Sequence, residues 1–263
     1  MAARAIWKGV LRLRDETVPL KLYAGIEDRR VHFRLLHAED LVPVKQRLVN
    51  PKTGDEVAYG DALRGYPTDD GRMVVLNQAE LEALQPESSR DLEVLRFVDP
   101  GELPHTWYDR PYFLGPDGES ARSAWEALAD ALERTGRTGI VRWTMRKKRY
   151  RGALRLHDGV PLLVTLRSAS EVLSSIELEA PGGRPLTSNE EEMARQLVEM
   201  LAGPFEPEEW EDTWRGRVME LIRAKAEGQT IAIQEYRERA AEGVSLEEAL
   251  AASLESAGGR KSA

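Results

Sequence analysis

The 263-residue sequence contains no cysteine, and no stretch of it is apolar for 18 residues in a row. The first absence excludes disulfides, thiolate metal ligands and a cysteine nucleophile. The second excludes a transmembrane helix, and the first 14 residues lack the apolar core of a secretory signal peptide. We therefore expect a soluble cytoplasmic protein with no membrane partner.

The sequence also lacks the short motifs of common catalytic and nucleotide-binding sites. It has no P-loop, no G-x-G-x-x-G and no G-x-S-x-G. None of its four histidines forms an H-E-x-x-H motif or a pair at i, i+4. We therefore predict a protein that is not an enzyme and has no catalytic residue, metal site or cofactor. A hydrolase that uses His37 or His105 with an acidic partner stays open as an alternative.

Charge is unevenly distributed along this acidic chain, whose formal net charge is −8. Residues 1–52 carry a net +5 and residues 136–169 a net +8, whereas residues 53–135 carry −11 and residues 170–263 carry −10. Phosphate binding depends on the local density of cations and not on the total charge. The distribution therefore predicts a concentrated basic surface on an otherwise acidic protein.

The first two-thirds of the chain reads mostly as strands, because apolar residues alternate with polar ones. A long excursion rich in proline and glycine interrupts them at about 37–72. Helices are predicted over 78–84 and over 119–134, the latter ending at Gly136. The predicted strands cover residues 4–14, 18–23, 31–36, 73–76, 91–98 and 160–166.

The sharpest local signal is a β-hairpin over 140–156, with its turn near Lys147–Lys148. One face of the hairpin is apolar and carries Trp143 and Tyr150, while the other is almost purely guanidinium. Eight basic residues between Arg137 and Arg155 have no acidic residue among them. Like charges that face each other across strands are destabilising unless something neutralises them. The two interpretations are a solvated face paired with the acidic blocks and a surface that binds a polyanion.

The aromatic residues of the strands also allow two interpretations. Trp7, Trp143 and Tyr150 could act as stacking platforms for single strands. Each falls on the apolar face of its strand, however, which favours a place in the core.

The last third of the chain is predicted to be helical. Ser188 and Glu191 form a capping box ahead of one helix, and Pro207 begins the next, which ends at Gly228. A short amphipathic helix over 245–255 follows, with Ser245 and Glu248 as its capping box. Apolar stripes on the last two helices indicate packing within the chain or a partner-binding surface, and their residues are Trp210, Trp214, Val218, Leu221, Leu246, Leu250 and Leu254.

Several segments, taken in order, resemble the prokaryotic Ku family, the homodimeric relatives of the eukaryotic Ku heterodimer. Together they span about residues 3–228, and the segment over 245–255 also resembles the short C-terminal element of bacterial Ku. The carrying segments are ARAIWKG (3–9), VPLKLY (18–23), DDGRMVVL (69–76), YDRPYFL (108–114), LIRAKAEG (221–228) and SLEEALAASLE (245–255).

The sequence departs from the family pattern at three places. Many bacterial relatives carry a Cys-x-x-Cys in the excursion, whereas the matching positions here are Asn50 and Thr53, so any metal staple is absent. The segment over 11–17 differs from the more apolar family version. No long lysine-rich tail follows Glu255.

The resemblance implies an α+β, β-dominated fold: a Ku-type β-barrel core with a protruding bridge at about 37–72, followed by C-terminal helices. The core would cover 1–228, with a helical arm at about 187–228, and 229–263 would form a C-terminal segment. Two subunits would form a ring on double-stranded DNA ends and work with an ATP-dependent DNA ligase in non-homologous end joining. An excursion of about 36 residues folded back on itself reaches at most about 60 Å, so two arms could circle a duplex.

Sequence-independent binding of this kind uses contacts to phosphates. We predict that the hairpin supplies most of these contacts and that the excursion adds to them. The predicted DNA-contacting residues are Arg142, Arg146, Lys147, Lys148, Arg149 and Arg151 of the hairpin, with Lys45, Arg47 and Lys52 of the excursion. The rival hypothesis is an interaction scaffold on the same barrel, whose basic face grips an acidic or phosphorylated peptide.

Overall fold

The computed structural model describes residues 4–173, 184–229 and 248–254. The chain divides into two compact units, one made of Met1–Arg29 with Phe33–Glu177 and one made of Arg30–His32 with Leu178–Ala263. The first unit contains a β-barrel and the second contains helices, so the predicted combination of a barrel and C-terminal helices is confirmed. No helix in the described part of the chain is long and apolar enough to cross a membrane.

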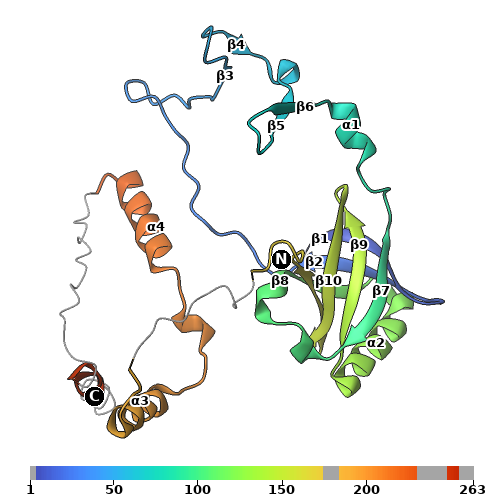
Figure 1. Cartoon of the computed structure of the whole chain (residues 1–263), viewed down its shortest axis with the longest axis vertical. Helices are drawn as coiled ribbons and strands as arrows, with labels where there is room; N and C mark the ends of the chain where they lie inside the picture. The colour runs from blue at the N-terminus through green and yellow to red at the C-terminus, as the bar shows by residue number, and fades with distance from the viewer. Residues whose placement is uncertain (1–3, 174–183, 230–247, 255–263) are drawn as a thin grey trace. The chain divides into compact units, whose positions relative to one another are not determined.

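A closed seven-stranded barrel is the core of the first unit (Figure 1). Its strands lie in the order β1-β2-β8-β11-β10-β9-β7, and β7 closes the barrel by pairing with β1 in parallel while all other neighbours are antiparallel. The strands are β1 (Ala5–Leu13), β2 (Glu16–Ala24), β7 (Asp91–Val98), β8 (Tyr108–Pro116), β9 (Thr138–Met145), β10 (Lys148–His157) and β11 (Val160–Leu166).

The interior of the barrel is built from the apolar residues that alternate along these strands. Trp143 is only 2% exposed and stacks on Tyr150, with ring centroids 5.3 Å apart. The interpretation of Trp143 as a core residue is therefore confirmed, and Trp7 and Tyr150 are partly buried and pack against the same core. Most of the other fully buried side chains are leucines, namely Leu11, Leu20, Leu22, Leu92, Leu114, Leu154 and Leu163.

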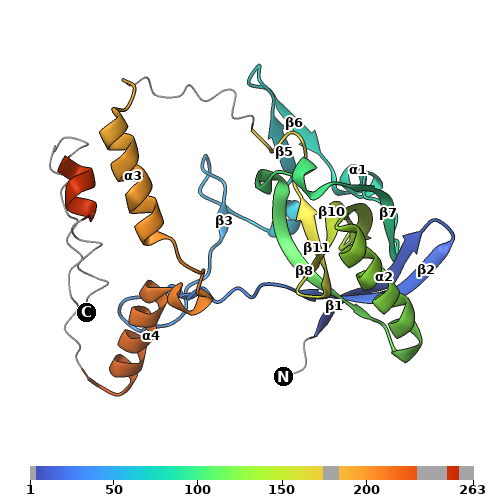
Figure 2. The ribbon, with the colours of Figure 1, turned by 90° about the horizontal axis from the view of Figure 1, so that it is seen from below.

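Helix α2 (Arg122–Thr135) adds two side chains to this core, because Leu128 and Leu132 lie in the same buried cluster as the strand residues. The helix packs against β2, β8 and β10 (Figure 2). Gly136 ends it with a φ of 60°, a left-handed conformation that glycine adopts without strain. The predicted helix and its stop are therefore confirmed.

The chain between β2 and β7, residues 25–90, contributes no strand to the barrel. It contains two small antiparallel hairpins, β3 (Leu48–Val49) with β4 (Glu56–Val57), and β5 (Arg64–Pro67) with β6 (Met73–Leu76). Helix α1 (Gln78–Ala83) follows, with a capping box made by Asn77 and Glu80. The excursion predicted at 37–72 lies within this longer segment.

The strand predicted over 31–36 was wrong. These residues form no strand, and their only bridge joins Leu36 to Pro43. Phe33 and Leu35 are 68% and 73% exposed. Alternation indicates a strand only where a neighbouring strand and a core are available, and in the described structure this segment has neither.

The turn between β3 and β4 is held by hydrogen bonds from the backbone to the side chains of Asn50 and Thr53. The Asn50 Oδ1 atom accepts from the Lys52 backbone N–H at 3.0 Å, and Thr53 Oγ1 accepts from the Asp55 N–H at 3.3 Å. The backbone closes the same turn, since Gly54 N–H donates to Asn50 O at 2.8 Å. Short polar side chains of this kind stabilise turns locally.

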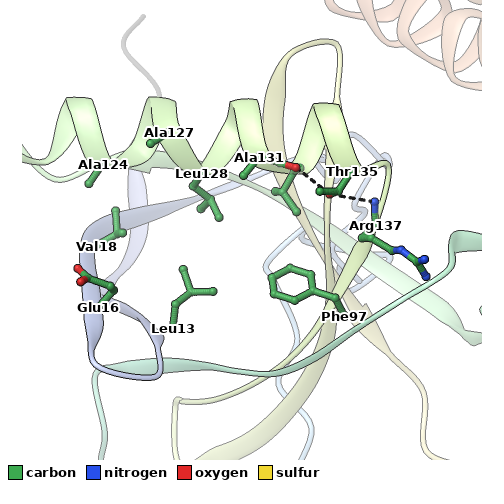
Figure 3. A pocket seen from close by; sticks show the side chains of 11 residues that line it. Leu13, Glu16, Val18, Phe97, Ala124, Ala127, Leu128, Ala131, Thr135 and Arg137 are labelled. Carbon is green, nitrogen blue, oxygen red and sulfur yellow. Dashed lines mark hydrogen bonds between the residues drawn. The ribbon is translucent and has the colours of Figure 1, made fainter.

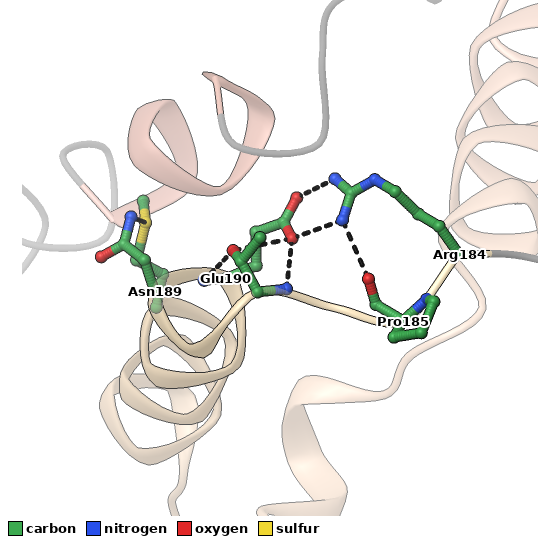
Figure 4. Close-up of polar contacts among 6 residues, drawn as sticks. Arg184, Pro185, Asn189 and Glu190 are labelled. Atoms are coloured by element: carbon green, nitrogen blue, oxygen red, sulfur yellow. Dashed lines mark hydrogen bonds and ion pairs between the residues drawn. The ribbon is translucent and has the colours of Figure 1, made fainter.

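Helix α3 (Ser188–Leu201) begins one residue earlier than predicted, because Thr187 and Glu190 form its capping box, not Ser188 and Glu191. Glu190 is 3% exposed, and its carboxylate accepts hydrogen bonds from Arg184 at 2.8 Å and from the Thr187 N–H at 2.8 Å (Figure 4). The Arg184 contact comes first among the causes that lower the Glu190 pKa to about 2, followed by the Thr187 backbone.

Helix α4 (Thr213–Ala226) begins later than predicted. Pro207–Glu209 form a separate 3-10 turn, and Asp212 caps α4 by accepting from the Arg215 N–H at 2.9 Å. Pro207 therefore marks the start of the 3-10 turn and not, as predicted, the start of the α-helix. A short polar residue at the N-cap is the stronger determinant of where the α-helix begins.

The described part of the C-terminal segment contains a helix over 248–254. Leu250 and Leu254 lie on this helix, and both side chains are partly buried. The predicted Ser245–Glu248 capping box and Leu246 include positions outside the described residues, so that part stays a prediction.

Candidate nucleic-acid interface

The basic hairpin is formed by β9 and β10, and its turn lies one residue earlier than predicted. Met145 pairs with Lys148, so the two turn residues are Arg146 and Lys147. Both have a positive φ, 51° and 63°. Two successive residues with positive φ define the turn type whose twist matches that of paired strands. Lys148 therefore belongs to β10 and not to the turn.

The outer face of the hairpin has a row of charges in register across three strands. Glu93 on β7 lies opposite Arg142 on β9, which lies opposite Arg151 on β10. Glu93 and Arg142 form an ion pair. The carboxylate thereby reduces the repulsion between the two arginines. For Arg142, the structure matches the interpretation of a solvated, salt-bridged face.

The remaining cations of the hairpin have no such partner. Arg146, Lys147, Lys148, Arg149 and Arg151 are exposed, and no carboxylate of the described residues lies within ion-pair distance of them. Lys148 instead lies over the Tyr150 ring, with its Nζ 5.5 Å from the ring centroid. The end of the hairpin is therefore a dense cluster of cations that are available to an external anion.

The three cations predicted on the excursion differ from one another. Arg47 forms an ion pair with Glu56 across the β3–β4 hairpin at 2.5 Å. Lys45 and Lys52 are exposed and have no ion pair among the described residues. Two of the three side chains are thus free for phosphate contacts, while Arg47 would have to exchange its partner.

A cleft of about 340 Å³ beside the hairpin contains a cation that the sequence analysis missed. Arg167, which follows β11, lines this cleft together with Lys148, Arg149 and Arg151 of β10. Its guanidinium donates to the carbonyl oxygens of Tyr108 and of Thr106, the latter at 3.2 Å. The sequence carries no periodic signal for this convergence, because Arg167 lies outside the strand pattern and meets β10 only in the folded barrel.

The apolar surface predicted on the helical unit is largely exposed. Trp210 is 73% exposed and stacks on Phe205 at 5.7 Å between ring centroids, and Trp214 is also exposed. Val218 and Leu221 are partly buried on α4. Exposed aromatic surface of this extent is unusual on a monomer and is typical of protein interfaces.

A second cavity, of about 610 Å³, lies between α2 and the β1–β2 end of the barrel (Figure 3). Leu13, Phe97 and Leu128 line it together with alanines of α2, and only Glu16, Thr135 and Arg137 bring polar groups to its edge. Arg137 forms an ion pair with Asp99 at 2.7 Å. An anion would gain little in this apolar cavity, so it is not part of the basic interface.

One histidine–carboxylate pair exists in the excursion. His37 Nδ1 lies 2.9 Å from Asp40 Oδ1, with both side chains more than half exposed. The Val42 backbone N–H is the first cause of a lowered Asp40 pKa, and His37 is the second. Water screens both groups, and among the described residues no group of three or more potential ligands is arranged to hold a metal ion.

Comparison with known proteins places this architecture in a family. The model of the Ku70/Ku80 β-barrel domain matches residues 13–198. The chain belongs to the Ku family. Its similarity to other members extends beyond the barrel, because curated Ku proteins align with nearly the whole chain.

Three relatives illustrate the similarity to other Ku proteins, and each is named non-homologous end joining protein Ku. The protein of Anaeromyxobacter sp. (strain K) is 38% identical over 97% of this chain and 86% of its own length. That of Pseudomonas aeruginosa is 34% identical over 98% and 91%, and that of Archaeoglobus fulgidus 34% over 96% and 98%. The family and the Ku-type barrel expected from the resemblance are confirmed.

Proposed function

We propose that this Ku chain binds double-stranded DNA ends without sequence specificity and acts in non-homologous end joining. The relatives named for that process support the proposal. The observation that carries it is the group of five exposed cations on the β9–β10 hairpin, none of which forms an ion pair with a carboxylate of the described residues. Cations that contact only phosphates bind duplexes of any sequence, which an end-binding protein requires.

The proposed active form is a homodimeric ring that has no catalytic activity of its own. Exposed apolar side chains support a second copy as the partner. They occur on the segment between β2 and β7, for example Phe33, Leu63 and Tyr59, and on the helical unit, for example Trp210. Large exposed apolar surfaces are normally covered in an assembly.

The proposed partner in repair is an ATP-dependent DNA ligase, which the ring recruits to the end. The candidate docking element is the C-terminal helix, whose described part covers 248–254. A helix of this length is marginal alone in water, and an apolar stripe that enters a groove on a partner would stabilise it.

Retention on linear and covalently closed circular duplexes of one sequence tests the end-binding proposal. We expect retention on the linear form only, because a ring can thread only from an end. Light scattering of the same sample should give about twice the chain mass of 29.5 kDa. Equal retention on both forms, or a monomer at micromolar concentration, would contradict the proposal.

A further inference from the structure

The cleft beside the basic hairpin differs from the rest of the basic surface because it is concave and combines cations from two separate segments. Lys148, Arg149 and Arg151 come from β10, and Arg167 comes from the turn after β11. β11 pairs with β10 only from Gly152 onward, so residues 148–151 of β10 have no partner on β11. The cleft of about 340 Å³ opens at this step in the sheet.

The walls of the cleft are held in place by local hydrogen bonds. Arg167 donates to two backbone carbonyls, and its Nη2 lies 3.8 Å from Asp109. Ser168 donates to the Glu171 carboxylate from its backbone N–H at 2.7 Å and from its hydroxyl at 2.8 Å. Groups that are already oriented lose less conformational entropy when a ligand arrives.

The charges of the cleft favour a dianion. Lys148, Arg149, Arg151 and Arg167 carry four positive charges, and the two carboxylates, Asp109 and Glu171, carry two negative charges, which leaves a net +2. A phosphate monoester carries about −1.5 to −2 at pH 7, whereas a phosphodiester in a nucleic-acid backbone carries one charge. The hydrogen bonds from Ser168 are the main cause of the lowered Glu171 pKa, and the positive charges of Lys148 and Arg167 lower it further. Both cations therefore lie near the Glu171 carboxylate.

The shape of the cleft selects between phosphates of the same polymer. Backbone phosphates lie along the outside of a stiff duplex, so they contact exposed cations such as those of the hairpin turn. A terminal phosphate projects from the end of a strand and can enter a recess. The cleft volume of about 340 Å³ is about ten times the roughly 30 Å³ that one water molecule occupies in the liquid. The recess therefore has space for such a group.

We propose that the cleft of Lys148, Arg149, Arg151 and Arg167 binds the terminal phosphate monoester of a DNA end. This inference rests on the proposed function, because it assigns a chemical feature of the end to one part of the same basic surface. The ring would then distinguish phosphorylated ends, which can be ligated, from ends that carry hydroxyl groups only.

Three duplexes of identical sequence test the inference: one with hydroxyl ends, one with 5′-phosphates and one with 3′-phosphates. We expect the full chain to bind at least one phosphorylated duplex about tenfold tighter than the hydroxyl-ended one, the effect of one or two charge-assisted hydrogen bonds. The Lys148→Gln variant should lose this preference. The Arg155→Gln variant should keep it, because it removes the same charge from the same strand outside the cleft.

The Arg167→Gln variant is a second test, and its thermal unfolding must be measured because Arg167 also holds two carbonyls. Calorimetric titration with thymidine 5′-monophosphate gives a readout independent of the duplex, and Lys148→Gln should weaken this binding.

Equal affinity for all three duplexes, or an unchanged preference in Lys148→Gln, would overturn the inference while the proposed function stands. Loss of the proposed function would appear differently, as failure to bind even the hydroxyl-ended duplex. A phosphoserine peptide that competes better than the nucleotide would also overturn the inference and favour a protein ligand.

Discussion

Gly152 occupies a position on β10 where a larger residue has no room. An added Cβ atom would lie 2.8 Å from Trp143 Cζ3, 2.9 Å from Leu163 Cδ1 and 2.9 Å from the Val164 carbonyl oxygen. The carbonyl oxygen belongs to the neighbouring strand, so it cannot move without disturbing the ladder. The close approach of Trp143 to the β10 backbone therefore depends on glycine.

We predict that Gly152→Ala lowers the free energy of unfolding by about 1–3 kcal/mol, the usual cost of overpacking a core. Urea unfolding followed by tryptophan fluorescence measures this change. Gly101→Ala is the matched control, because its added Cβ would contact nothing within 4 Å, and its effect should stay within about 0.5 kcal/mol. An equal effect of both substitutions would show that the contact is not limiting.

Glu190 makes the stability of the helical unit depend on pH. Its pKa falls to about 2 in the folded protein, chiefly through Arg184, whereas an unfolded glutamate has a pKa near 4.3. A lowered pKa stabilises the fold fully above the unfolded value and loses its effect as pH falls through the folded value. The contribution should therefore decline between about pH 4.5 and pH 2.

The substitution Glu190→Gln tests this dependence, because glutamine resembles the protonated carboxyl. At pH 7 we expect a lower melting temperature than that of the wild type. The difference should shrink as pH decreases and vanish near pH 2. A difference that stays constant over this range, measured by circular dichroism at 222 nm, would contradict the assignment.

The β9–β10 hairpin is the element on which the proposed DNA contact mainly depends. Changing Arg146, Lys147 and Lys148 to alanine should weaken binding equally for all duplex sequences. Each lost phosphate contact should reduce the slope of log K against log salt by about 0.9. Titrations at several salt concentrations measure both quantities.

The control for this prediction is a triple variant that removes the same charge elsewhere. Arg122, Arg134 and Arg195 each pair with a carboxylate three or four residues away on a helix. Changing them to alanine should leave the salt slope unchanged. If the hairpin variant retains full affinity and slope, the hairpin is a solvated face and not a DNA contact.

On the scale of the whole molecule, the C-terminal segment is predicted to be separable from the rest. Deleting residues 244–263 should leave dimerisation and DNA-end binding intact and abolish the stimulation of ligation. Ligation assays with the end-joining ligase, beside light scattering and duplex binding, measure the three properties. Lost solubility or a melting temperature lower by several degrees would show that the helix over 248–254 belongs to the core, and unchanged stimulation would show that it is not the docking element.

The sequence by itself indicated six of the seven barrel strands and the two faces of the basic hairpin, but it gave no strand prediction for β8 (Tyr108–Pro116). Alternation is a local property, so Val141, Trp143 and Met145 could be assigned to the core without knowledge of neighbouring strands, and all three are buried. Gly136 likewise marked the end of α2 through its own backbone preference. The ordered set of family-like segments then indicated the Ku barrel.

The tertiary structure alone decided which cations are neutralised and which converge. The Arg142–Glu93 pair joins residues 49 positions apart. Arg167 lines the same cleft as Lys148, where residues 148–151 of β10 have no partner on β11. Neither contact follows from a local pattern, because each depends on which strands become neighbours when the barrel closes. The same reason explains the failed strand at 31–36, where alternation was present but no neighbouring strand pairs with it.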